Sequence, residues 1–63
     1  MGATVVVEKC TLHETLRGVL EKIDEADALG LHPRGAVRIT PYSFLDDALI
    51  EHTTWTAAIY FGK

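Results

Sequence analysis

Hydrophobic and polar positions follow two different periods along the chain, and each change of period marks a new element. Residues 3–9, ATVVVEK, are short and β-branched, which favours a strand. Their three consecutive valines predict either burial on both faces, or one face in the core and the other in an interface.

A helix is predicted directly after this strand. Thr11 and Glu14 have the spacing of a capping box, in which each side chain satisfies a free backbone N–H at a helix start. Gly30 is the expected residue beyond the helix end at Leu29, and Pro33 stops the helix from resuming. Apolar residues recur between these points at helical spacing and predict one stripe that covers the sheet: Leu12, Leu16, Val19, Leu20 and Ile23.

One residue inside the predicted helix is unfavourable there. Gly18 costs about 1 kcal/mol relative to alanine, and it lies next to the apolar stripe. We therefore expect a strand or another helix to approach closely at this position.

Two further strands are predicted from alternating positions. In residues 35–40, GAVRIT, Val37 and Ile39 share one face, and Pro41 indicates an edge, a bulge or the end of that strand. Arg38 and Thr40 share the other face. Residues 53–62, TTWTAAIYFG, place Trp55, Ala57, Ile59 and Phe61 on one face and Thr56, Ala58 and Tyr60 on the other.

Residues 43–52, SFLDDALIEH, allow two interpretations. Ser43 and Asp46 have capping spacing, and Asp46 and Asp47 would lie at the favourable end of a helix dipole. This favours a short helix from Phe44 to His52. The alternative is a long hairpin that turns near the sequence DDA.

The predicted fold class is therefore α+β, a single small domain over residues 1–63, with the order strand, helix, strand, short helix or turn, strand. One amphipathic helix can cover one face of a three-stranded sheet. The other face, which carries Tyr60 and by one interpretation Val6, stays uncovered, and we expect a second subunit there. A chain of this length buries only about 60% of its unfolded surface, and its single cysteine, Cys10, cannot form an internal disulfide. We therefore expect a homo-oligomer, a dimer or larger.

The net charge and the lengths of the apolar runs indicate which partners and which cellular location to expect. The net charge of −3 disfavours binding to nucleic acid polymers, which calls for a basic face. The chain shows neither an export signal nor an apolar run long enough for a membrane, so we expect a cytoplasmic protein without membrane contact.

Charge is unevenly distributed, and this indicates the candidate site. The acidic residues are Glu8 and two blocks, Glu14 to Asp27 and Asp46 to Glu51, so residues 28–45 contain only basic or neutral side chains. Arginine binds phosphate or carboxylate with two parallel hydrogen bonds, and aromatic rings can stack on a flat ligand. We therefore predict a site for an anionic, nucleotide-like ligand formed by His32, Arg34, Arg38, Tyr42, Trp55 and Tyr60. The alternative is that both arginines pair with carboxylates of the helix or of a neighbouring chain.

Other chemistry has less support. Cys10 and His13, with His32 and His52, could in principle bind zinc, but their spacing is not diagnostic, and we expect neither metal nor cofactor. Asp46, Asp47, Glu51 and His52 could in principle form an acid–base or cation site, but helix capping already accounts for the two aspartates. The sequence contains no phosphate-binding, dinucleotide-binding or zinc-protease motif.

The sequence therefore predicts a small non-catalytic binding protein that acts as a homo-oligomer and binds an anionic small molecule. The alternative is a protein-interaction module, an inhibitor or regulator, that presents its acidic helix to a basic protein partner.

Overall fold

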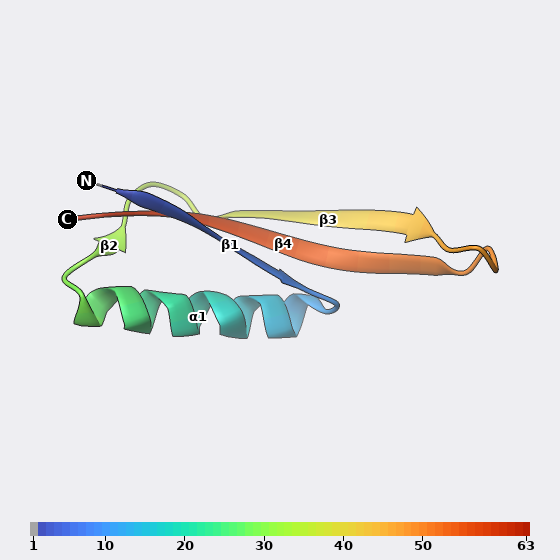
Figure 1. Cartoon of the computed structure of the whole chain (residues 1–63), viewed down its shortest axis with the longest axis horizontal. Coiled ribbons are helices and arrows are strands. Elements are labelled where there is room, and N and C mark those ends of the chain that lie inside the picture. The colour runs from blue at the N-terminus through green and yellow to red at the C-terminus, as the bar shows by residue number, and fades with distance from the viewer. Residues whose placement is uncertain (1) are drawn as a thin grey trace.

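The computed structural model describes residues 2–63 and contains one helix packed on an antiparallel sheet (Figure 1). The predicted α+β class is confirmed. The elements in chain order are β1 (Ala3–Lys9), α1 (Leu12–Ala28), β2 (His32–Pro33), β3 (Arg38–Leu45) and β4 (Glu51–Gly62).

The last strand, β4, is the centre of the sheet. β1 runs antiparallel along one side of β4, from Ala3 opposite Phe61 to Lys9 opposite Trp55. The other side is shared by two strands: β2 pairs with residues 61–62, and β3 pairs with residues 51–58. Of the three alternatives for Pro41, the structure has the edge position, since β3 pairs only with β4 and continues beyond the proline. The two-residue strand β2 was not predicted.

The ends of α1 lie where the sequence placed them. Thr11 Oγ1 accepts a hydrogen bond from the Glu14 backbone N–H at 3.1 Å. At the other end, the N–H groups of Gly30 and Leu31 donate to the carbonyls of Asp27 (3.0 Å) and Ala26 (2.9 Å), the pattern of a Schellman motif. Gly30 has φ of +76°, a conformation that glycine adopts without a steric penalty.

The core lies between α1 and one face of β1 and β4. Its buried apolar residues are Val7, Val19, Ala26, Ala57, Ile59 and Phe61. The predicted alternation along β4 is confirmed, because Ala57, Ile59 and Phe61 are buried while Tyr60 is half exposed. Thr15 is fully buried, and its hydroxyl lies 2.8 Å from the Thr11 carbonyl and 3.2 Å from the Trp55 carbonyl.

The predicted apolar stripe of α1 is partly wrong. The buried positions are Thr15, Val19 and Ala26, with Ile23 partly buried, whereas the side chains of Leu12, Leu16 and Leu20 are exposed. The reason is the position of Gly18, where an added β-carbon would lie 2.7 Å from Val7 Cγ1. This contact rotates α1 toward β1, so the leucines lie on the opposite flank of the helix.

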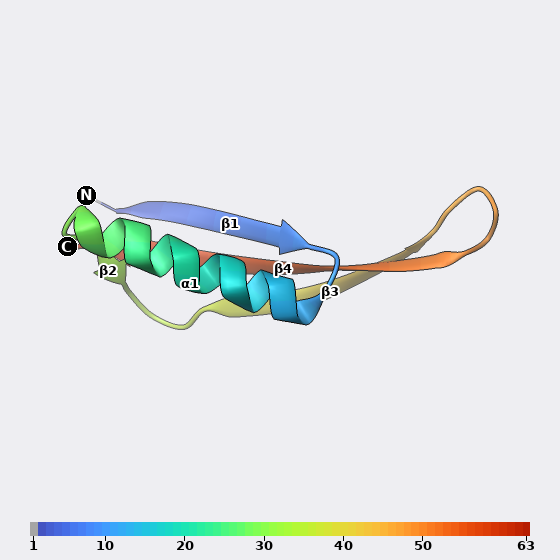
Figure 2. The same cartoon turned by 90° about the horizontal axis from the view of Figure 1, so that it is seen from below.

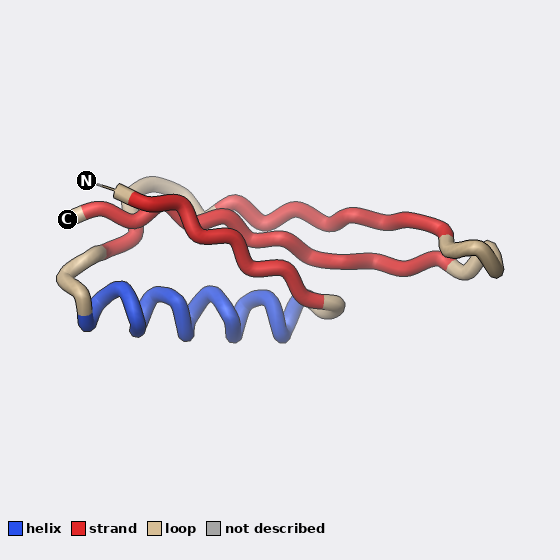
Figure 3. Tube along the Cα trace, in the orientation of Figure 1, coloured by secondary structure: helices blue, strands red, loops and turns tan. Residues whose placement is uncertain are grey.

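The preference for a short helix over residues 44–52 is wrong. The strand expected to end at Pro41 starts at Arg38 and continues through the proline to Leu45, and β4 begins at Glu51. Residues 42–54, which we call the arm, have no strand beside them except each other. The arm projects past the N-terminal end of α1 (Figures 1 and 3). It gives the molecule extents of 46 × 17 × 16 Å.

A hydrogen-bonded turn closes the arm where a helix start was expected. Asp46 Oδ1 accepts from the backbone N–H groups of Ala48 (2.9 Å) and Ile50 (3.0 Å). Aspartate commonly replaces backbone acceptors in such turns. Leu49 has φ of +61°, which leucine rarely adopts. Two backbone hydrogen bonds, from Asp46 N–H to the Ile50 carbonyl (3.1 Å) and from Leu49 N–H to the Asp46 carbonyl (2.9 Å), also close the turn. The main chain and the side chain of Asp46 therefore hold the tip together.

Candidate functional site

The face of the sheet opposite α1 is uncovered, and we call it the open face. Figure 2 shows α1 lying along the other face, on the side of β1 and β4. Because side chains alternate along strands, the register assigns the residues of the open face. They are Thr4, Val6 and Glu8 of β1, Arg38, Thr40, Tyr42 and Phe44 of β3, and His52, Thr54, Thr56, Ala58, Tyr60 and Gly62 of β4.

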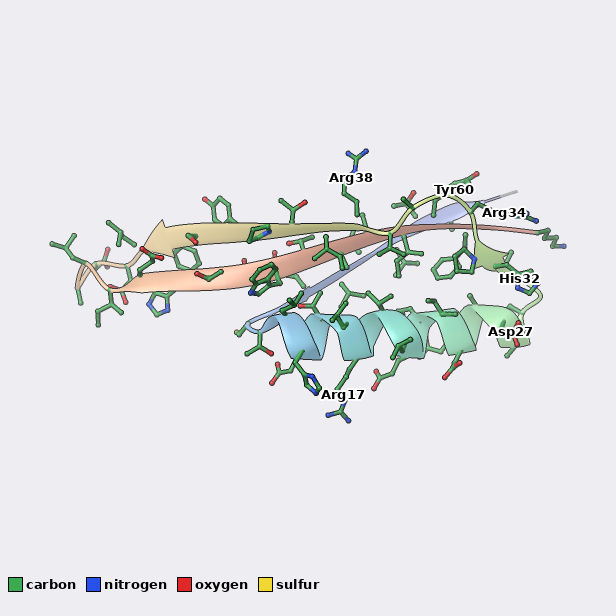
Figure 4. All side chains as sticks on the ribbon, turned by 180° about the vertical axis from the view of Figure 1, so that it is seen from behind. Arg17, Asp27, His32, Arg34, Arg38 and Tyr60 are labelled. Atoms are coloured by element: carbon green, nitrogen blue, oxygen red, sulfur yellow. The ribbon has the colours of Figure 1, made fainter. Side chains whose placement is uncertain are left out.

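Arg38 and Tyr60 are neighbours on this face. Arg38 is paired with Ala58, two residues before Tyr60. Such diagonal positions are about 7–8 Å apart, within reach of long side chains. Both side chains point away from α1 (Figure 4), and Tyr60 is 50% exposed. The Tyr60 hydroxyl lies where a β-carbon at Gly2 would be, so its ring leans toward β1. Arg38 and Tyr60 therefore share the face, one on each side of β4, and the described residues show no cation–π contact between them.

Arg34 is held beside the same pair by its backbone. Its N–H donates to the Tyr60 carbonyl at 2.8 Å. Its side chain packs on Gly62, where an added β-carbon would lie 3.2 Å from Arg34 Cγ, and its guanidinium donates to the Lys63 carbonyl. Gly35, with φ of +83°, lets the loop turn back toward β3. Arg34 and Tyr60 lie near one end of the open face, and Arg38 lies farther along the sheet on β3 (Figure 4). We call these three residues the Arg–Tyr cluster.

Neither arginine of the cluster is paired with an acidic side chain. Across residues 2–63, no Asp or Glu carboxylate forms an ion pair with Arg34 or Arg38, although the Arg34 guanidinium donates to the Lys63 carbonyl. The acidic helix lies on the opposite face of the sheet (Figure 4). The only carboxylate of the open face on the neighbouring strands is Glu8, whose Oε2 lies 3.4 Å from Thr56 Oγ1. The intrachain pairing considered as an alternative for these arginines is therefore absent from the described residues.

Three of the predicted site residues lie outside this cluster. His32 is turned toward the end of α1, with Nδ1 3.5 Å from Asp27 Oδ1 (Figure 4). Trp55 lies on the helix side of the sheet, with Ala57 and Ile59. Tyr42 is on the open face but four residues along β3 from Arg38, which is about 13 Å.

Tyr42 belongs instead to an aromatic row on the arm. Its ring centroid is 6.0 Å from that of Phe44, and Phe44 is 5.4 Å from His52, both at stacking angles. Sequence reasoning missed this row because it assigned Phe44 and His52 to a helix. The alternation of Thr40, Tyr42 and Phe44 was the signal that β3 continues beyond Pro41.

His52 also connects the row to the turn. Its Nε2 is 2.7 Å from Asp46 Oδ2. This hydrogen bond, helped by the backbone N–H of Ile50, lowers the pKa of Asp46 below its ordinary value of 3.8. The contact therefore stabilises the ionised form of the carboxylate that closes the arm.

The described part of the chain offers no grouping of three His, Cys, Asp or Glu side chains suited to a metal ion. Cys10 is exposed as a free thiol. No helix within residues 2–63 is long and apolar enough to cross a membrane.

Comparison with known proteins finds no matching family model, no matching curated protein and no matching solved structure.

The chain exposes more surface than a compact monomer. Its accessible area is 4760 Å², whereas about 4000 Å² is expected for this mass. Its radius of gyration is 13.9 Å, against about 11 Å for a compact domain of this length. Large apolar side chains account for part of the excess on α1, on the open face and on the arm: Leu12, Leu16, Leu20, Val6, Tyr42, Phe44, Leu45, Leu49 and Ile50.

Proposed function

We propose that this chain is a homo-oligomeric, non-catalytic binding protein whose Arg–Tyr cluster binds an anionic, nucleotide-like small molecule. The observation that carries the proposal is that Arg34, Arg38 and the half-exposed Tyr60 share the open face, with neither arginine paired to an Asp or Glu carboxylate in residues 2–63.

The chemistry of the cluster selects the ligand class. Guanidinium groups bind phosphate or carboxylate with paired hydrogen bonds, which are stronger than neutral ones. The phenol ring of Tyr60 offers an apolar surface to a base or another flat ring. Because Arg34 is already anchored through its backbone and through Gly62, little ordering is needed when the ligand binds.

The oligomer is supported by the excess of exposed area. The difference from a compact monomer is close to the roughly 800 Å² that each partner buries in a typical specific interface. A sheet face covers only one side of a ligand, so a neighbouring subunit is also a natural source of further contacts. We also propose that the protein acts in the cytoplasm.

The competing proposal is a protein-interaction module that presents α1 to a basic protein. Its support is the row of exposed carboxylates on that helix: Glu14, Glu21, Asp24, Glu25 and Asp27. Two basic residues, Arg17 and Lys22, interrupt the row, and Lys22 pairs with Glu25 at 3.2 Å. The Arg–Tyr cluster has no such internal compensation, so we favour the small ligand.

Calorimetric titration with AMP and with inorganic phosphate tests the ligand. We expect saturable AMP binding that is weakened at least about tenfold by Arg38→Glu, as for loss of a charge-assisted hydrogen bond. Phosphate should bind more weakly than AMP, because it cannot stack on Tyr60. Arg17→Glu is the matched control, since Arg17 points away from the sheet and the charge change is identical (Figure 4).

The competing proposal predicts a different outcome. If a basic protein is the partner, Glu21→Lys with Asp24→Lys abolishes binding to that protein, and Arg38→Glu leaves this binding intact. Equal AMP affinity in Arg38→Glu and Arg17→Glu would contradict the ligand site.

A further inference from the structure

We propose that the free edge of β1 pairs antiparallel with β1 of a second copy, centred on Val6, and joins the two sheets into one. This deepens the homo-oligomeric part of the proposed function and names its interface. It does not depend on ligand binding, because the two arginines of the Arg–Tyr cluster lie on the other side of β4.

Only one edge of the sheet is suited to such pairing. β1 has β4 on one side and no strand on the other within residues 2–63. The opposite edge is formed by β2, which contains Pro33, and by β3, which contains Pro41. Proline cannot donate to a ladder and protects a strand edge from further pairing. The seven residues of β1 contain neither proline nor glycine, so every backbone group that points to the free edge can take part.

The sequence of β1 is self-complementary along its full length when it is centred on Val6. With Val6 opposite the partner's Val6, all seven residues of each strand are paired. Val5 then lies opposite the partner's Val7 on the helix side, and Thr4 lies opposite the partner's Glu8 on the open face. No two like charges are opposite each other, and apolar residues meet apolar residues. Shifting the centre to Glu8 would instead oppose two carboxylates, which is unfavourable.

The surface along this edge can receive the partner's side chains. A groove of about 210 Å³ runs beside the start of β1, with Ala3, Val5, Ala26, Leu29 and Phe61 on its apolar part. In the proposed register the partner's Val7 comes opposite Val5, next to this apolar lining. Leu29, which is 74% exposed in the single chain, lies in the same groove.

No like charges oppose each other at the ends of the strand. Lys9 lies opposite the partner's Ala3 in this register. Ala3 shares its groove with the Lys22–Glu25 ion pair (3.2 Å), so the ammonium group of Lys9 comes near a pair without net charge. Two-fold symmetry repeats this arrangement at the other end. A foreign strand could use the same free backbone groups, but the full-length overlap and the apolar centre favour a second copy.

Disulfide trapping tests the register directly. In a Cys10→Ser background, which removes the exposed native thiol, Val6→Cys places two thiols at the two-fold axis. The Cα atoms of directly opposite residues are about 4.5–5.5 Å apart, within the range of a disulfide. We expect nearly complete intermolecular crosslinking under mild oxidation. Thr4→Cys is the matched control, because the two Thr4 residues would be about 13 Å apart along the strand.

A mixture of Thr4→Cys and Glu8→Cys chains gives an independent readout, since these positions are opposite each other across the interface. We expect the mixed disulfide to dominate over both homodimers. Equal crosslinking of Val6→Cys and Thr4→Cys, or no crosslinking of Val6→Cys, overturns the proposal. So does a mixture without preference for the mixed disulfide.

A variant without an added cysteine tests how much Val6 contributes to the stability of the dimer. Val6 is exposed in the single chain, so Val6→Lys leaves the fold intact while opposing two ammonium groups at the axis. We expect the dimer dissociation constant to rise about tenfold or more, with Val6→Thr close to the parent. An unchanged dissociation constant in Val6→Lys contradicts the interface. Arg38→Glu should still crosslink through Val6→Cys, so failure of the ligand site and failure of this interface are distinguishable.

Discussion

Gly18 of α1 lies directly on Val7 of β1, and the two leave no space for another atom. A β-carbon at Gly18 would be 2.7 Å from Val7 Cγ1, closer than carbon atoms pack, and Val7 is itself buried. This contact sets the rotation of the helix over the sheet. It therefore decides which residues of α1 enter the core and which stay exposed.

Gly18→Ala is expected to destabilise the fold although alanine is the better helix former. Overpacking costs about 1–3 kcal/mol, and the gain in helix propensity is about 1 kcal/mol. We predict a net loss of up to about 2 kcal/mol in urea unfolding at fixed protein concentration. In a Val7→Ala background the same change should become neutral or stabilising. An equal effect in both backgrounds would show that the close contact does not decide the outcome.

Thr15 connects α1 to the centre of the sheet. It is fully buried, and its hydroxyl lies within hydrogen-bond distance of the Thr11 and Trp55 carbonyls. Thr15→Val keeps the shape but removes the hydroxyl from both contacts, while the Thr15 backbone N–H still donates to the Thr11 carbonyl. We therefore expect a loss of about 1 kcal/mol. Thr53→Val is the matched control, because Thr53 bonds Ser43 in an exposed position on the arm; its effect should stay within about 0.5 kcal/mol. Similar losses at both sites would be inconsistent with a special role for Thr15.

The arm should be sensitive to acid. The pKa of Asp46 is lowered below 3.8, chiefly by its hydrogen bond to His52. The folded arm therefore binds fewer protons than the unfolded one, and the stabilisation is complete above pH 3.8 and is lost as the pH falls through the lower folded pKa. Amide hydrogen exchange of Ala48 and Ile50 should accelerate in that range, beyond the intrinsic pH trend. In Asp46→Asn the acid-dependent step should disappear. If it persists, another group controls the turn.

Local signals in the sequence predicted much of the fold. The spacing of Thr11 and Glu14 and the position of Gly30 gave both ends of α1, and alternation gave the buried face of β4. These features depend on residues close together in the chain. The arm could not be assigned in the same way, because an aspartate such as Asp46 caps a helix start or closes a turn with the same acceptor atoms.

Local sequence patterns predicted less of the candidate site than of the fold. Arg34 and Tyr60 are neighbours only because β2 and its following residue pair with the end of β4, a long-range relationship that no local pattern encodes. Alternation alone, however, separates Trp55 from Tyr60. The two residues are five positions apart on one strand, so they must point to opposite faces. Their roles in binding remain predictions.

The central claim is that the chain works as a ligand-carrying oligomer. Native mass spectrometry of protein purified gently from its producing cells measures the number of subunits and any retained small molecule in one spectrum. We predict an even number of copies, as pairing through β1 requires, with additional mass from a bound anion. A bare monomer at micromolar concentration would contradict both the oligomer and the site.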